Sequence, residues 1–137
     1  MKRPHLLLLM LLLALFSGFE SRAQYKIVWE IASGDTTDQK MLYKQVNNVL
    51  NAAPGTQIEL VFHGPAITAV LKDTGYFKQE LLGIHRRGVR IAACGNSLKN
   101  RGIDPARLMP EAFIVPAGIV EIVQKQEEGW RYIKAGH

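Results

Sequence analysis

Cysteine is the residue that this sequence has least of. Its 137 residues contain one cysteine, Cys94. A single cysteine cannot close a disulfide within its own chain, so Cys94 is a free thiol, an inert buried residue or one half of a bridge to another chain. A chain of this length can build its core without disulfides, so their absence does not argue against an oxidising compartment.

Motifs that hold cofactors are also missing. The sequence contains neither GxGxxG nor GxxxxGK[ST], the glycine patterns that bind nucleotide phosphates. It has no GxSxG serine motif, and no cysteine and histidine spacing that is typical of a metal site. We therefore expect no metal site and no organic cofactor.

Long apolar runs are absent apart from one near the start. Eleven apolar residues, Leu6–Phe16, follow Lys2 and Arg3 and precede an SRA sequence that ends at Ala23. This is the layout of a secretory signal peptide, with small residues at the two positions that a signal peptidase reads. A retained membrane anchor is the alternative, but eleven residues fall short of the ~20 that span a bilayer.

Cleavage after Ala23 divides the chain into a signal peptide, residues 1–23, and a single domain, residues 24–137. The predicted destination is the periplasm or the outside of the cell, with no stable membrane span after cleavage. Without the signal the chain has 14 basic and 11 acidic residues, a mild balance of +3. The arginines at 86–90 are expected on a solvated helix end, so no nucleic-acid partner is predicted.

The domain alternates between strand-like and helix-like segments. Strands are expected at residues 25–31, 57–63, 89–94, 112–115 and 130–134, with helical stretches between them. This alternation predicts an α/β fold with a five-stranded, mostly parallel sheet covered by helices. The pattern does not set the order of the strands.

Three helix starts are indicated by capping residues. Thr36 is followed three residues later by Gln39, the spacing of a capping box. Asn96 or Ser97 can cap a short helix after the third strand. Pro116 suits the first turn of the last helix, because the N–H that proline lacks has no partner there.

Cys94 ends the third predicted strand, at the edge of the sheet where ligands and reactive groups gather in α/β folds. A helix start there would favour the thiolate and make Cys94 the candidate nucleophile, with Gly95, Asn96 and Ser97 as binding residues. His63 ends the second strand and could orient or deprotonate Cys94. The alternatives are a cysteine that only packs and a histidine bonded to the backbone.

Three runs carry a resemblance to a known family: IELVFHGPAI (58–67), IHRRGVRIAACGNSLKNRGI (84–103) and AFIVPAGIVEIVQKQEEGWRYIK (112–134). The sequence resembles the DsrE/DsrF-like family of small sulfur-relay proteins over essentially the whole domain. The resemblance implies a flavodoxin-like, three-layer α/β/α domain with strand order 4-3-2-1-5. It also implies homo- or hetero-oligomers, often trimers or hexamers.

In the relay members of that family, a cysteine carries a persulfide from one protein to the next, and Cys94 is the matching residue. One hypothesis is therefore that Cys94 carries sulfane sulfur or exchanges thiols with a donor or acceptor protein, without a cofactor. The alternative is a non-catalytic, oligomeric binding or scaffold module with a structural cysteine. Four apolar side chains could serve either the core or a subunit interface: Ile119, Ile122, Trp130 and Tyr132.

Overall fold

The computed structural model describes residues 24–136, which form one five-stranded sheet with helices on both faces. The predicted signal peptide and His137 lie outside the described residues. The strands are β1 (Lys26–Ile31), β2 (Gln57–Phe62), β3 (Arg90–Cys94), β4 (Ala112–Val115) and β5 (Arg131–Ala135). The helices are α2 (Thr36–Ala52), α3 (Lys78–Arg86), α4 (Gly95–Asn100) and α5 (Gly118–Glu127), with 3₁₀ helices η1 (Gly64–Val70) and η2 (Pro105–Arg107).

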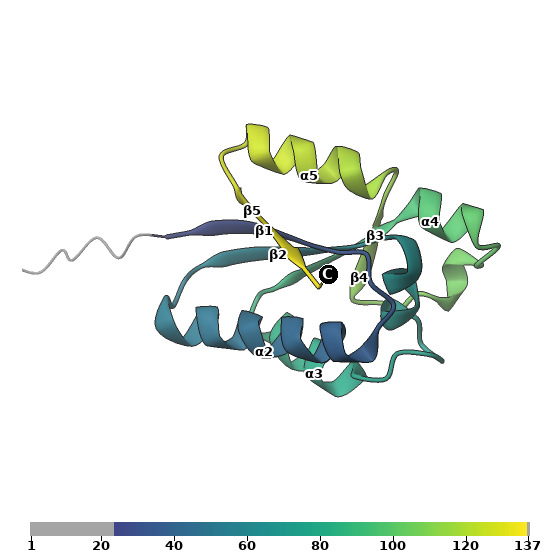
Figure 1. The fold of residues 1–137 in the computed structure, drawn as a ribbon, viewed down its shortest axis with the longest axis horizontal. Coiled ribbons are helices and arrows are strands. Elements are labelled where there is room, and N and C mark those ends of the chain that lie inside the picture. The colour runs from purple at the N-terminus through teal and green to yellow at the C-terminus, as the bar shows by residue number, and fades with distance from the viewer. Residues whose placement is uncertain (1–23, 137) are drawn as a thin grey trace, which may run out of the picture.

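All four strand pairings are parallel, and the order across the sheet is β4-β3-β2-β1-β5. The predicted α/β class is confirmed, and so is the strand order that the family resemblance implied. Figure 1 shows the three layers, with α5 on one face of the sheet and α2 and α3 on the other. Because every strand is parallel, the carboxyl ends of all five meet at one edge of the sheet.

The face that α2, α3 and η1 cover holds the larger core. α2 faces it with Leu42, Tyr43, Val46 and Leu50, which recur at helical spacing and are all buried. They pack against alternate strand residues such as Leu60, because side chains along a strand point in turn to opposite faces. Fully buried aliphatic side chains of this kind each contribute about 1.5–3 kcal/mol to folding.

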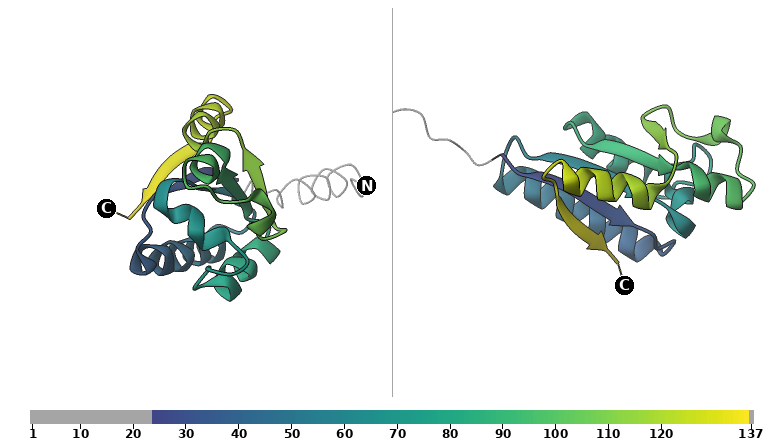
Figure 2. Two further views of the ribbon diagram at one scale, coloured as in Figure 1. Left: turned by 90° about the vertical axis from the view of Figure 1, so that its right-hand side faces the viewer. Right: turned by 90° about the horizontal axis from the view of Figure 1, so that it is seen from above.

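In the described part of the chain, a single helix covers the opposite face. Figure 2 shows α5 crossing the sheet by itself when seen from above. The core beneath it is correspondingly small, with Phe113 packed at its margin. Its buried members are Val28, Val61, Ala92, Val115, Ile122 and Trp130. Polar residues of the sheet on this face therefore lie beside a thin apolar layer.

One of these polar residues is Glu59 of β2, whose side chain is fully buried. Arg90 Nε lies 3.1 Å from its Oε2 and stacks its guanidinium over the Phe113 ring at 4.9 Å. Burial, followed by the neighbouring carboxyl group of Glu121, raises the pKa of Glu59 to about 7. This cluster sits on β2 and β3 at the opposite end of the strands from Cys94.

The predicted strands are confirmed to within a residue at each end, but the helix starts differ. The capping box at Thr36 is wrong: Asp35 is the N-cap, and its Oδ1 accepts from the Thr37 N–H at 2.6 Å. The Asp35 carboxylate is also stabilised by the positive end of the helix dipole. α5 starts at Gly118, with Ala117 as its N-cap, instead of at Pro116.

Between β2 and β3 the sequence predicts a helical stretch at residues 66–71 and a helix from about residue 76 to 87. The first stretch forms the 3₁₀ helix η1, which begins at Gly64, and α3 begins at Lys78, slightly later than predicted. Within residues 24–136 no helix is long and apolar enough to cross a membrane.

Candidate functional site

Cys94 is the last residue of β3 and the N-cap of α4. The predicted caps, Asn96 and Ser97, lie inside α4, because the helix begins at Gly95 directly after the cysteine. Cys94 Sγ accepts a hydrogen bond from the Gly118 N–H of α5, with N and S 3.2 Å apart. The residue is 5% exposed. Its sulfur therefore lies between the starts of two helices, beneath the surface.

The surroundings of the sulfur favour its charged form. Burial raises the pKa of the Cys94 thiol, but hydrogen bonds lower it by more, so the pKa lies below its usual value. The donors near the sulfur are the Ser97 hydroxyl and the backbone N–H groups of Gly118, Ser97 and Asn96, and that of Gly118 is directly hydrogen-bonded to it. Cys94 is buried among donors that stabilise a thiolate, unlike a cysteine that only fills apolar space.

Gly118 owes its place to having no side chain. A β-carbon there would lie 3.2 Å from His63 Cβ, 3.2 Å from Val61 Cγ1 and 3.3 Å from Cys94 Cβ. These separations are tighter than ordinary van der Waals contacts, so a larger residue would push the start of α5 away from the sheet. The glycine thus brings its own N–H to the sulfur.

The other predicted binding residues shape the turn around Cys94. Gly95 lies against the Val115 carbonyl, 3.1 Å from where its β-carbon would be, so the chain turns into α4 at once. The Asn96 N–H donates to the Pro116 carbonyl at 3.2 Å, which joins α4 to the segment before α5. Ser97 Oγ accepts from the Gly64 N–H at 2.8 Å. All three lie beside Cys94, as the sequence indicated.

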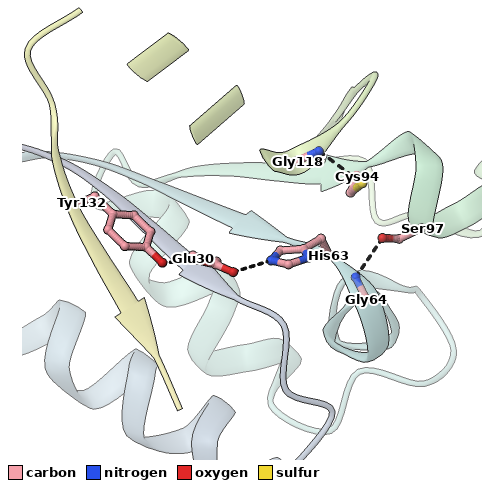
Figure 3. A network of polar contacts seen from close by, with 7 residues as sticks. All are labelled: Glu30, His63, Gly64, Cys94, Ser97, Gly118 and Tyr132. Carbon is pink, nitrogen blue, oxygen red and sulfur yellow. Dashed lines mark hydrogen bonds and ion pairs between the residues drawn. The ribbon is translucent and has the colours of Figure 1, made fainter. Parts of the chain in front are cut away.

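His63 follows β2 and stands next to Cys94. The pairing of Phe62 with Ala93 makes His63 and Cys94 the next neighbours along the two parallel strands. His63 Nε2 lies 2.7 Å from Glu30 Oε1, and the other Glu30 oxygen accepts from the Tyr132 hydroxyl. Figure 3 shows the three side chains in a row that ends at His63, near Cys94 and Gly118.

The row contains Glu30, which the sequence analysis missed, and Tyr132, which it considered only for the core or an interface. Glu30 lies in β1 and Tyr132 in β5, so only the pairing of these strands brings them together. A signal for Glu30 was available, since it is the one acidic residue of its strand and lies among the apolar residues that follow Lys26. An acidic side chain at a buried strand position needs a partner, and such partners are often functional.

The ionisation of the row is set by its own contacts. Burial raises the pKa of Glu30, but the hydrogen bonds from Tyr132 and His63 lower it by more, so the pKa lies below its usual value. The hydrogen bond to Glu30 is the main cause that raises the pKa of Tyr132 to about 12. At neutral pH Glu30 is therefore a carboxylate, and the Tyr132 hydroxyl keeps its proton and donates a hydrogen bond to it.

The described residues contain no cluster of three or more histidine, cysteine, aspartate or glutamate side chains that could hold a metal. The arrangement they do contain is a buried thiol at a helix start with a histidine–carboxylate–tyrosine row beside it. Fold and site together define a parallel α/β domain with one buried thiol at a strand end.

The family model for the DsrE/DsrF-like family matches residues 26–135, which is nearly the whole described domain. The chain belongs to the DsrE/DsrF-like family. The predicted family is confirmed. A search of the curated proteins found no match.

Solved structures with the same fold come from three microorganisms. MTH1491 from Methanobacterium thermoautotrophicum, a protein of unknown function, is 28% identical with a TM-score of 0.78, over 81% of this chain and 99% of that one. The ychN protein from E. coli is 17% identical with a TM-score of 0.67, over 81% and 98% of the two chains. BT1422 from Bacteroides thetaiotaomicron is 19% identical with a TM-score of 0.62, over 85% and 99%.

The close packing at Gly118 can be tested by adding one methyl group. Gly118→Ala is expected to destabilise the domain by about 1–3 kcal/mol, because the new β-carbon crowds His63, Val61 and Cys94. The measurement is urea unfolding. Gly83→Ala is the matched control, since a β-carbon there meets nothing within 4 Å and alanine is the better helix former. Equal stability of the two variants would contradict the close packing.

Proposed function

We propose that this domain carries sulfane sulfur on Cys94, which it receives from one protein or small donor and hands to an acceptor. The observation that carries the proposal is the contact of Cys94 Sγ with the Gly118 N–H, in a setting of donors that favours the thiolate. The thiolate is the nucleophile in sulfur exchange, so these donors increase the reactive fraction of the cysteine. Membership of the DsrE/DsrF-like family supports the same role.

The chemistry needs no cofactor. The Cys94 thiol releases its proton, and the thiolate attacks the outer sulfur of a donor persulfide, R–S–SH. A new sulfur–sulfur bond forms to Cys94 while the donor's sulfur–sulfur bond breaks. The electron pair leaves with R–S⁻, which takes up the released proton to give R–SH. Cys94 then holds the sulfur as a persulfide, and the reverse steps pass it on.

Sulfur uptake is tested by mass spectrometry of the intact protein. After incubation with thiosulfate or a low-molecular-weight persulfide, the protein is expected to gain the mass of one sulfur atom, and a reducing thiol is expected to remove it. Cys94→Ser is the control and gains nothing. Alkylation of Cys94 is also expected to reach half its maximal rate below the pH typical of free cysteine, because its thiol pKa is lowered. No mass gain would refute the carrier function, and an ordinary alkylation midpoint would contradict the lowered thiol pKa.

A scaffold module with a structural cysteine is the second candidate, and the 5% exposure of Cys94 favours it. The two candidates differ in what Cys94→Ser does. A scaffold keeps its function when the sulfur is replaced, whereas a carrier loses it. The sulfur-uptake experiment therefore decides between them.

We also propose that the domain assembles with copies of itself, as a trimer or hexamer. Of the four apolar residues considered for the core or an interface, Ile122 and Trp130 are buried within the chain, while Ile119 and Tyr132 are exposed. Ile119 joins Val120 and Val123 in an apolar patch on α5, each about half exposed. Exposed apolar patches of this kind are typical of protein interfaces.

The assembly is tested by a charge placed in this α5 patch. Val123→Lys is expected to lower the mass measured by light scattering to that of a monomer, because burying a lysine between subunits is costly. Met41→Lys is the matched control, since Met41 has the same exposure but lies on α2, across the sheet. If the protein without any substitution already has the mass of a monomer, the proposed assembly is wrong.

Export is a proposal that rests on the sequence of residues 1–23. Protein recovered from the periplasm of an expressing bacterium is expected to begin at Gln24. The measurement is its intact mass. Ala23→Arg is the control variant, because the peptidase requires a small residue there, and it is expected to keep its signal. Full-length protein in the cytoplasmic fraction would argue against export.

A further inference from the structure

A row of hydrogen bonds links the edge strand β5 to the neighbourhood of Cys94. Tyr132 of β5 donates to Glu30 of β1, and Glu30 in turn contacts His63 Nε2 at 2.7 Å. The His63 and Glu30 side chains are only 17% and 12% exposed. Their contacts are therefore partly shielded from water, where a charge-assisted hydrogen bond is stronger than at the surface.

The row fixes where the protons are. Glu30 is a carboxylate and accepts hydrogen bonds only, so the proton between Glu30 and His63 must sit on His63 Nε2. In the neutral ring, Nδ1 then has no proton and can accept one. Among the described residues, no hydrogen bond to Nδ1 of His63 is present. The histidine is thus held in one tautomer with its second nitrogen available.

The available histidine and the thiol are neighbours. A β-carbon on Gly118 would lie 3.2 Å from His63 Cβ and 3.3 Å from Cys94 Cβ. The distance between the β-carbons of His63 and Cys94 is therefore at most the sum of these two distances. Both side chains leave the same face of the sheet, from adjacent positions of paired strands. Figure 3 shows the imidazole ring between Glu30 and the pair formed by Cys94 and Gly118.

We propose that Glu30 and Tyr132 are positioning residues that hold His63 ready to take the proton of Cys94 and to return it during sulfur transfer. This role rests on the proposed function for its place in that reaction. When Cys94 loses its proton, directly or through one water, His63 becomes an imidazolium ion whose charge the Glu30 carboxylate stabilises. The proton then passes to the leaving R–S⁻ group, and His63 returns to its neutral form.

The Glu30 carboxylate is held by hydrogen bonds from His63 and Tyr132, so it does not turn toward Cys94. Tyr132 fixes one carboxylate oxygen so that the other stays on His63 Nε2. His63 is the member of the row beside the thiol, so proton exchange with Cys94 passes through its ring.

The test is the pH profile of Cys94 alkylation by iodoacetamide in the full domain. His63→Gln and Glu30→Gln are each expected to move the midpoint upward by about one pH unit, which is roughly tenfold slower alkylation at neutral pH. Glutamine keeps the size of Glu30 but removes its charge, and its amide can present the wrong hydrogen-bonding group to His63. Tyr132→Phe is expected to shift the midpoint less, and Glu30→Asp to restore part of the profile.

Glu59→Gln is the matched control. Glu59 is a second buried glutamate on the same face of the sheet, but it lies four residues before His63 in β2 and pairs with Arg90. Its replacement is expected to leave the alkylation midpoint unchanged. Thermal unfolding of every variant separates a change in the thiol from a loss of structure.

The outcomes for this row and for sulfur transfer are distinguishable. If Cys94 takes up sulfur but neither His63→Gln nor Glu30→Gln moves the midpoint, the proton role is refuted and the carrier function stands. If both variants move the midpoint but Cys94 takes up no sulfur, the row tunes the thiol and the carrier function is refuted. A shift in Glu59→Gln equal to that in Glu30→Gln would refute the positioning role, because it would mean that any buried charge has the same effect.

Discussion

The close approach of α5 to the sheet at Gly118 is the contact on which the rest of the site depends. Without a β-carbon at this residue, the start of α5 fits between His63 and Cys94 and places its N–H on the sulfur. Within residues 24–136 the same helix alone covers this face, and its Ile122 belongs to the small apolar core there. The stability of that face and the environment of the thiol are therefore set by one contact.

The fold could be predicted from the sequence because its elements depend on local patterns. The alternation of apolar strands such as Gln57–Phe62 with amphipathic stretches such as Thr36–Ala52 is visible in a single sequence and leads to a parallel α/β sheet. The helix starts were less predictable. Asp35 and Thr36 can both cap α2, and Asn96 could cap α4. Which residue is the N-cap of each helix depends on where the preceding strand ends.

The candidate site could be predicted in part, along the strand ends. Cys94 and His63 follow neighbouring strands, so their meeting follows from the topology. Glu30 and Tyr132 are 102 residues apart, and nothing in the spacing of the sequence joins β1 to β5. The role of Gly118 was equally hidden, because a glycine at a helix start has many explanations until the residues around it are known.

The burial of Cys94 has a consequence for the timing of its chemistry. Cys94 is only 5% exposed and the start of α5 covers its sulfur, so we expect a bulky partner to reach the sulfur only when the start of α5 moves away. Under the proposed carrier function, both loading and unloading of sulfur would require this opening, and oxidants would meet the same barrier. A sulfur atom held there would have a long lifetime between partners, and its release would depend on a partner that lifts α5.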